Sequence, residues 1–204
     1  YYIHYTGRDF DYPGFHSHET HFQQNKLSGR FTAERYQLSV RLVNEEDAGY
    51  ILKLRTDTGL AKFIHQTDND LDKHLKWMKQ YKERELDGRD YYFIYFRDGQ
   101  PVGVNRIYNI YHYYATIGSW ICDPTNDAET SIATYFFMLD ILFEYMNLDL
   151  TIFDVRKKNT HVWKLHKMAG AIKVGESDVD YYFTINKQTY LSQRESLLSI
   201  SNIK

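Results

Sequence analysis

The sequence predicts a mixed α/β fold in which helices flank a mostly antiparallel sheet. Segments with strand-like alternation and segments with helical spacing follow one another in the order β-α-α-β-β-β-α-β-α-β-β. The turn Asp98-Gly99 joins two of the predicted strands as a hairpin, which makes the early part antiparallel. The segment from Phe153 to Ala171 runs from strand to helix and straight into a further strand, so a parallel crossover is expected late in the chain.

The first elements have clear start and stop signals. LSVRLV (38–43) alternates apolar and polar residues and predicts a strand. Asn44 then precedes a helical segment with acids in its first turn, so we expect Asn44 to be its N-cap. A second helix spans 68–86 and ends at Gly88, and strands are predicted at 91–96, 101–111 and 115–123.

The later elements follow the same logic. Residues 131–146 are apolar nearly all round, which is typical of a helix packed deep against a sheet. Asn159 opens a short helix over 160–168, which Gly170 ends. The remaining predicted strands are 150–155, 171–176 and 181–186, and a last helix is expected over 188–201.

Composition limits the classes of function. With 204 residues, 43% of them hydrophobic, the chain can bury the core of one domain. The 17% aromatic content fits either a core filled with rings or a cleft with ring walls. The net charge of −2, with both signs scattered, argues against a nucleic-acid groove, and no apolar run approaches the roughly 20 residues of a membrane span.

The first residues lack the pattern of a secretory signal, and a single cysteine allows no intrachain disulfide. We therefore expect a cytoplasmic protein, with a homodimer as one option for its assembly. Residues 1–37 show no sustained periodicity and are predicted to be an irregular extension. Three histidines, His16, His18 and His21, lie close together there, but no cysteine or carboxylate signature accompanies them, so we expect solvated histidines and no metal site.

Three segments resemble motifs of the GCN5-related N-acetyltransferases (the GNAT family). RLVNEEDA (41–48) resembles the opening of the family domain, and IGSWICDP (117–124) resembles the strand before its phosphate loop. FDVRKKN (153–159) with the following helix resembles its last conserved segment. The resemblance covers residues 38–190. It implies a GNAT-like acyltransferase domain over 38–204, with a splayed central pair of strands and acetyl-CoA as co-substrate.

The resemblance also implies where acetyl-CoA binds. The pantetheine arm would pair with an open strand edge, and the pyrophosphate would meet unpaired N–H groups at a helix N-terminus. The loop departs from the family pattern because it has no glycine and two acids, which leaves open weak CoA binding, a reshaped loop or a lost activity. The implied cofactor-binding residues are Trp120, Ile121, Cys122, Asn126, Ala128, Glu129, Thr130, Ser131 and Asn159.

Several of these residues have a plain structural alternative. Thr130 or Ser131 could simply be an N-cap, as could Asn159 for the next helix. Cys122 has no evident His–Asp partnership, so we expect it to be a small buried residue rather than a nucleophile. His166 lies seven residues after Asn159, where many GNAT enzymes carry the tyrosine that protonates the departing thiolate. A histidine can serve in that role, although a thiolate can also take its proton from solvent.

The acceptor should be a primary amine that attacks the thioester directly. By the resemblance, the acceptor lies over the sheet centre, with Arg55, Trp77, Arg106 and Tyr108 as candidate lining residues. Arg106 could pair with a substrate phosphate or carboxylate, or it could face outward on an alternating strand. The shared segments look most like those of bacterial enzymes that N-acetylate an amino group of a nucleotide-linked sugar. A ribosomal-protein-type N-terminal acetyltransferase and a catalytically inert binding domain are the alternatives.

Overall fold

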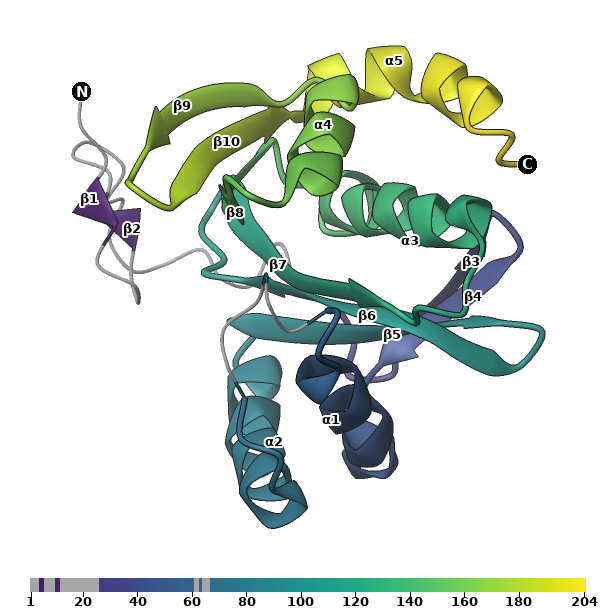
Figure 1. The fold of residues 1–204 in the computed structure, drawn as a ribbon, viewed down its shortest axis with the longest axis vertical. Coiled ribbons are helices and arrows are strands. Elements are labelled where there is room, and N and C mark those ends of the chain that lie inside the picture. The colour runs from purple at the N-terminus through teal and green to yellow at the C-terminus, as the bar shows by residue number, and fades with distance from the viewer. Residues whose placement is uncertain (1–3, 6–9, 12–25, 61–62, 64–66) are drawn as a thin grey trace.

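An eight-stranded sheet forms the centre of the computed structural model, which describes residues 26–60, 63 and 67–204 and the backbone of residues 4–5 and 10–11. The strand order is β3-β4-β5-β6-β7-β8-β10-β9, and a separate pair, β1–β2, precedes it (Figure 1). The strands are β1 His4–Tyr5, β2 Phe10–Asp11, β3 Thr32–Arg35, β4 Leu38–Leu42, β5 Asp90–Arg97, β6 Gln100–Tyr108, β7 Tyr114–Cys122, β8 Leu150–Arg156, β9 Ile172–Glu176 and β10 Asp180–Asn186.

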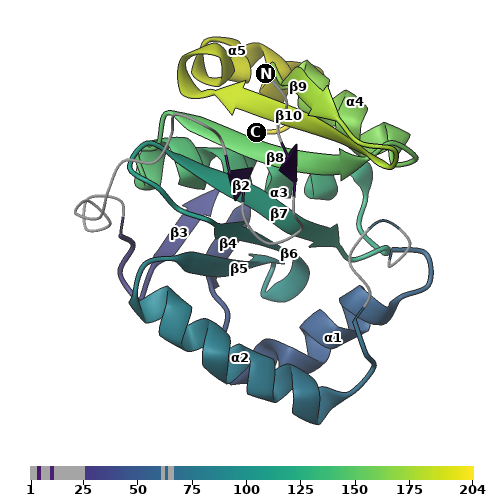
Figure 2. The same cartoon turned by 90° about the vertical axis from the view of Figure 1, so that its left-hand side faces the viewer.

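Helices cover both faces of the sheet. Figures 1 and 2 show α1 and α2 on one face and α3 on the opposite face, where α4 and α5 also lie. The helices are the 3-10 turn η1 Glu45–Asp47, α1 Ala48–Thr56, α2 Leu71–Leu86, α3 Ala128–Asp140 with its π-helical continuation η3 Ile141–Tyr145, α4 Thr160–Met168 and α5 Lys187–Ile200.

One strand pair in the sheet is parallel, and it opens. β7 and β8 are in register only at Tyr114–Leu150 and Ala115–Thr151, while every other neighbouring pair among the described strands is antiparallel. Beyond Ala115 the two strands diverge. This confirms the mixed, mostly antiparallel sheet with a splayed central pair.

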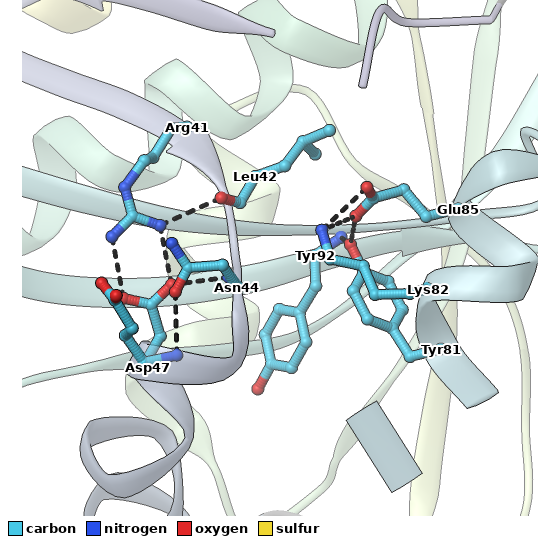
Figure 3. A network of polar contacts seen from close by, with 9 residues as sticks. Arg41, Leu42, Asn44, Asp47, Tyr81, Lys82, Glu85 and Tyr92 are labelled. Carbon is cyan, nitrogen blue, oxygen red and sulfur yellow. Dashed lines mark hydrogen bonds and ion pairs between the residues drawn. The ribbon is translucent and has the colours of Figure 1, made fainter. Parts of the chain in front are cut away.

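The RLVNEEDA segment folds around one ion pair. The Arg41 guanidinium donates to both carboxylate oxygens of Asp47, at 2.7 and 2.8 Å (Figure 3). Asn44 accepts a hydrogen bond from the N–H of Glu46 at 2.9 Å, and its own N–H donates to Asp47 at 2.8 Å. Asn44 is thus the N-cap predicted from the sequence, and the ion pair fixes β4 to the start of the first helical turn.

Tyrosines join α2 to the sheet. The Tyr81 hydroxyl donates to Glu85 and accepts the N–H of Tyr92 at 2.8 Å, and Lys82 donates to the same carboxylate at 2.9 Å (Figure 3). The largest fully buried side chains are all tyrosines or phenylalanines. Much of the aromatic content therefore fills the core, as one of the two readings of the composition proposed.

A buried carboxylate ties the sheet edge to the C-terminal helix. Asp140, at the end of α3, is fully buried and accepts the hydroxyls of Tyr36 at 2.5 Å and Tyr190 at 3.0 Å. Arg35 and Arg194 pair with it at 2.7 and 3.1 Å. Two guanidiniums and two hydroxyls surround the charge, which is the pairing that a buried carboxylate requires.

Some boundaries differ from the sequence prediction. β3 lies inside residues 1–37, so that segment is not irregular throughout: Thr32–Arg35 extends the sheet by pairing with β4. β6 ends at Tyr108 rather than 111, and α3 begins at Ala128 rather than 131 because Asp127 caps it. His16, His18 and His21 lie outside the described residues.

The described part of the chain contains neither a candidate membrane span nor a candidate metal-binding cluster. None of its helices combines the length and the apolar character needed to cross a membrane. Nor do its histidines, cysteines and carboxylates form any group of three or more that could hold a metal ion.

Candidate active site

A cavity of about 150 Å³ opens where β7 and β8 diverge. Its walls come from Gly118–Trp120 of β7, Phe153–Arg156 of β8, and Asn159, Val162 and His166 at and after the start of α4. Arg55, Phe63 and Tyr108 line it from the side of α1 and α2, and Met138 lines it from α3. The cavity thus joins the two faces of the sheet through the gap between the strands.

A β-bulge in β7 lies at this gap. Ser119 and Trp120 together face the single residue Asn105 of β6, and Ser119 has a positive φ of 49°. A bulge leaves one residue out of the ladder and turns its backbone groups aside. Next to it, a Cβ at Gly118 would lie 2.9 Å from the Tyr108 hydroxyl, so glycine is what lets the Tyr108 ring lie against the strand.

The N-terminus of α3 is already occupied by a carboxylate. Asp127 is its N-cap and accepts the N–H of Thr130 at 2.6 Å, so the alternative that Thr130 or Ser131 caps the helix is wrong. Hydrogen bonds from Thr130 hold the pKa of Asp127 below its usual value, which keeps the carboxylate ionised. Ala128 and Glu129 form the exposed and half-buried start of the first turn.

Residues 126–131 contain no basic side chain, but one from another element contacts this loop. Arg97, at the end of β5, donates to the Thr130 hydroxyl at 2.5 Å. Asn126 turns the other way and donates its side-chain amide to the Val102 carbonyl at 2.7 Å. No local pattern could reveal Arg97, because it lies 33 residues before Thr130 in the chain.

Cys122 is inert where it lies. Its sulfur contacts the Thr134 hydroxyl at 3.3 Å, and burial raises the pKa of the thiol to about 11. The Trp120 indole N–H donates to the same hydroxyl at 2.9 Å, and Ile121 is buried beneath α1 and α2. These side chains are structural, as predicted for Cys122. Any contact of this part of β7 with a cofactor would therefore come from its backbone.

Asn159 does not use its side chain to cap α4. It precedes the helix at φ −84° and ψ 66°, and its side chain makes no capping hydrogen bond. The capping alternative is therefore wrong, and the Asn159 side chain lines the cavity instead.

His166 is buried deep beside the cavity. It is 4% exposed, its Nδ1 lies 2.9 Å from the Tyr135 hydroxyl, and its ring centroid is 4.2 Å from that of Phe153. Burial lowers the pKa of His166 to about 3. Roughly one imidazole in ten thousand is therefore protonated at pH 7, so a proton donated by an imidazolium has no support here.

The other predicted lining residues meet on the α1–α2 side. A cavity of about 310 Å³ lies there, lined by Arg55, Trp77 and Arg106 together with His74 and Lys73. Arg55 also lines the cavity between the strands, as does Tyr108, so the two spaces adjoin. The four residues expected to meet the acceptor are thus brought together around the open strand pair.

Arg106 does not face outward, as one alternative held. It donates to both oxygens of the buried Asp90, at 3.1 and 2.5 Å, and its guanidinium carbon lies 5.3 Å from the Trp77 ring centroid. His74, which the sequence reading missed, stacks on Trp77 and is 7% exposed. Its buried Nε2 has no hydrogen-bond partner among the described residues, and burial lowers the pKa of His74, which favours the neutral ring.

Known proteins share this architecture. The family profile for the acetyltransferase (GNAT) domain matches residues 37–172. The structure of apo FdhC, described as a nucleotide-linked sugar GNAT, is 28% identical, with a TM-score of 0.74 over 82% of this chain and 97% of that one. A search of curated protein sequences found no match.

Two further structures show the same fold at lower identity. Spermidine N-acetyltransferase from Vibrio cholerae, in complex with CoA and spermine, is 18% identical, with a TM-score of 0.66 over 77% of this chain and 99% of that one. Mycobacterium smegmatis RimJ, in complex with CoA-disulfide, is 19% identical, with a TM-score of 0.66 over 78% and 88%. With its divergent strand pair and its matching family profile, the chain belongs to the GNAT acetyltransferase family and is an N-acetyltransferase that uses acetyl-CoA.

Proposed function

We propose that this enzyme acetylates an amino group of a nucleotide-linked sugar. The observation that carries the proposal is the cationic and aromatic wall on the acceptor side, where Arg55 and Arg106 lie with Trp77 around one cavity. Arginines suit the phosphates of such an acceptor, and ring faces suit a sugar or a base. The 28% identity to a nucleotide-linked sugar GNAT supports the same acceptor class.

A polyamine fits this wall less well. A polycation requires carboxylates, and the acids in the same cavity, Asp68 and Asp70, are partly neutralised by Lys73, whose Nζ lies 2.9 Å from Asp68. The two arginines would repel it further. The spermidine enzyme and RimJ, at 18% and 19% identity, share the fold with this chain and carry no information on its acceptor.

Acetyl-CoA supplies an activated acetyl group on a thioester. The open edge of β7 at Ile121 and Cys122 offers backbone groups to the pantetheine amides, and the uncommitted side chain of Asn159 offers a further polar contact. The bulge at Ser119 provides the candidate backbone donor for the thioester oxygen. Arg97 and the first N–H groups of α3 would hold the phosphates, once the Asp127 carboxylate gives up its cap.

Proton transfer follows from the neutral state of His166. Since its pKa lies near 3, we assign the proton of the departing thiolate to solvent and give His166 a positioning role beneath the cavity. Its hydrogen bond with Tyr135 holds α4 against α3. The acceptor amine must be neutral when it attacks. His74, whose pKa is lowered by burial, lines the acceptor cavity and adds no positive charge that would repel a protonated amine.

The test is an acceptor screen that follows thiol release from acetyl-CoA. Nucleotide-linked amino sugars, polyamines and peptide N-termini are offered at equal concentration, after a calorimetric titration with acetyl-CoA alone. Acetylation of a nucleotide-linked amino sugar at the highest kcat/KM supports the proposal. Preference for a peptide would replace it with the N-terminal acetyltransferase. Absent acetyl-CoA binding would indicate that the Asp127-capped loop has become inert.

A further inference from the structure

A second arginine-rich cavity lies beside the connection between β6 and β7. It measures about 340 Å³, and its lining includes the arginines Arg84, Arg89 and Arg106, one carboxylate, Asp90, and the rings of Tyr108 and Tyr111. Its arginines come from the end of α2, the α2–β5 turn and β6, which are separate parts of the chain. The fold therefore gathers positive charge at this place.

The cluster keeps an excess of positive charge. Arg84 lies 3.1 Å from Asp90, and Arg106 lies 2.5 Å from the same carboxylate. One negative charge is therefore shared by two positively charged guanidiniums. Asp90 is almost fully buried. At the rim Arg89 pairs with Asp87 at 2.6 Å, and both side chains are more than half exposed, which makes that pair weak.

The two inner guanidiniums are already held in place. Arg84 lies 5.5 Å and Arg106 lies 5.3 Å from the Trp77 ring centroid, and Arg106 lies 4.8 Å from that of Tyr108. Stacked and ion-paired arginines lose little freedom when an anion binds. Their geometry suits the paired oxygens of a phosphate.

This cavity cannot serve the phosphates expected at α3. It adjoins Tyr108, whose register partner on β7 is Thr116, whereas α3 follows the far end of β7 at Cys122. Six strand residues separate these points, which is about 20 Å. An anion bound here therefore belongs to a second ligand.

We infer that this arginine cluster binds the diphosphate of a nucleoside diphosphate-linked acceptor. The inference rests on the proposed function and locates the nucleotide part of the acceptor in this cavity. Tyr108 lines both this cavity and the one between the splayed strands, so a ligand anchored on the arginines can extend across Tyr108 toward the bulge at Ser119. Tyr111 lines the same cavity with its ring stacked on Tyr114 at 4.6 Å between centroids, so the base would lie beside this aromatic pair.

Direct binding tests the cluster without catalysis. Calorimetry with UDP, dTDP, inorganic pyrophosphate and uridine as probes should show binding of the diphosphates and of pyrophosphate, and none of the nucleoside. Arg84→Met should weaken UDP and dTDP binding about tenfold or more, because one charge-assisted contact is lost. Lys79→Met, which removes an exposed charge from the same helix, should leave it unchanged.

A second variant tests the cluster without disturbing the buried ion pairs, in case Arg84→Met fails to fold. Arg89→Met leaves the Asp90 network untouched and should weaken the diphosphates severalfold. Equal affinity of the wild type, Arg84→Met and Arg89→Met for UDP and dTDP would overturn the inference, as would absence of any diphosphate binding by the wild type.

Kinetics separates this inference from the proposed function. With a nucleotide-linked amino sugar, Arg84→Met should raise KM and leave kcat within about twofold. If such sugars are acetylated and Arg84→Met has no effect on KM, the inference fails and the function stands. If no such sugar is acetylated but the diphosphates bind through Arg84, the proposed function fails, and the cluster is a diphosphate site that does not serve the acceptor.

Discussion

Burial of a neutral imidazole predicts how the stability of this enzyme depends on pH. The pKa of His166 is about 3 in the folded chain and about 6.5 when the chain unfolds. Between pH 6.5 and pH 3, His166 therefore binds a proton in the unfolded state but not in the folded state. Stability falls as the pH drops from 6.5 toward 3, and the group has almost no effect above pH 7.

The size of the effect follows from the shift. Each pH unit in this window changes the free energy of unfolding by about 1.4 kcal/mol, so the wild type should lose about 2 kcal/mol through His166 between pH 7 and pH 5. Other groups titrate in the same range. His166→Phe removes only the histidine's part, so the difference between the two proteins isolates it.

The assay is urea unfolding at pH 7 and pH 5. His166→Phe leaves the buried Tyr135 hydroxyl without its partner, which costs about 1–3 kcal/mol at both pH values, and the double variant with Tyr135→Phe should recover much of that loss. Equal pH dependence of the wild type and both variants would refute the argument. A drop in turnover of His166→Phe beyond about tenfold at pH 7, in a folded protein, would restore the acid role of His166.

Three further changes test the site. Asp127→Asn keeps a good N-cap and removes the charge from the α3 N-terminus, so calorimetry should show acetyl-CoA binding about three- to tenfold tighter. Glu195→Gln, at an exposed position of α5, is the control and should leave the affinity unchanged. Asn159→Ala should weaken acetyl-CoA about threefold or more with the melting temperature unchanged, because the side chain makes no cap; a lower melting temperature with unchanged affinity would contradict this. Gly118→Ala places a methyl group 2.9 Å from the Tyr108 hydroxyl and should raise the acceptor KM severalfold, while an unaltered KM would show that the ring moves aside freely.

Much of the fold could be predicted from the sequence because the signals that start and end its elements are local. Asn44 with its following acids predicted the start of the first helical turn, and the segment from Phe153 to Ala171 predicted the last crossover. The α3 start was missed because Asp127, Thr130 and Ser131 are all good caps, and local chemistry does not choose among them.

The candidate site was harder to predict because its contacts span the chain. Arg97 reaches Thr130 from another element, and Asp90 joins Arg84 to Arg106 across α2, β5 and β6. His166 stands at the predicted position, but its charge state depends on burial among rings from other strands and helices. Sequence spacing reports where a side chain lies along the chain and says little about the dielectric around it.

The recognisable family segment and the folding unit have different limits. All four groups that satisfy the buried Asp140, namely Arg35, Tyr36, Tyr190 and Arg194, lie outside residues 37–172. A protein shortened to the matched segment would keep the family motifs. It would also leave the buried Asp140 carboxylate without its four partners. The residues that flank the matched segment thus supply the counter-charge of the domain. A shortened protein for crystallisation or engineering should begin before Thr32 and run past Arg194.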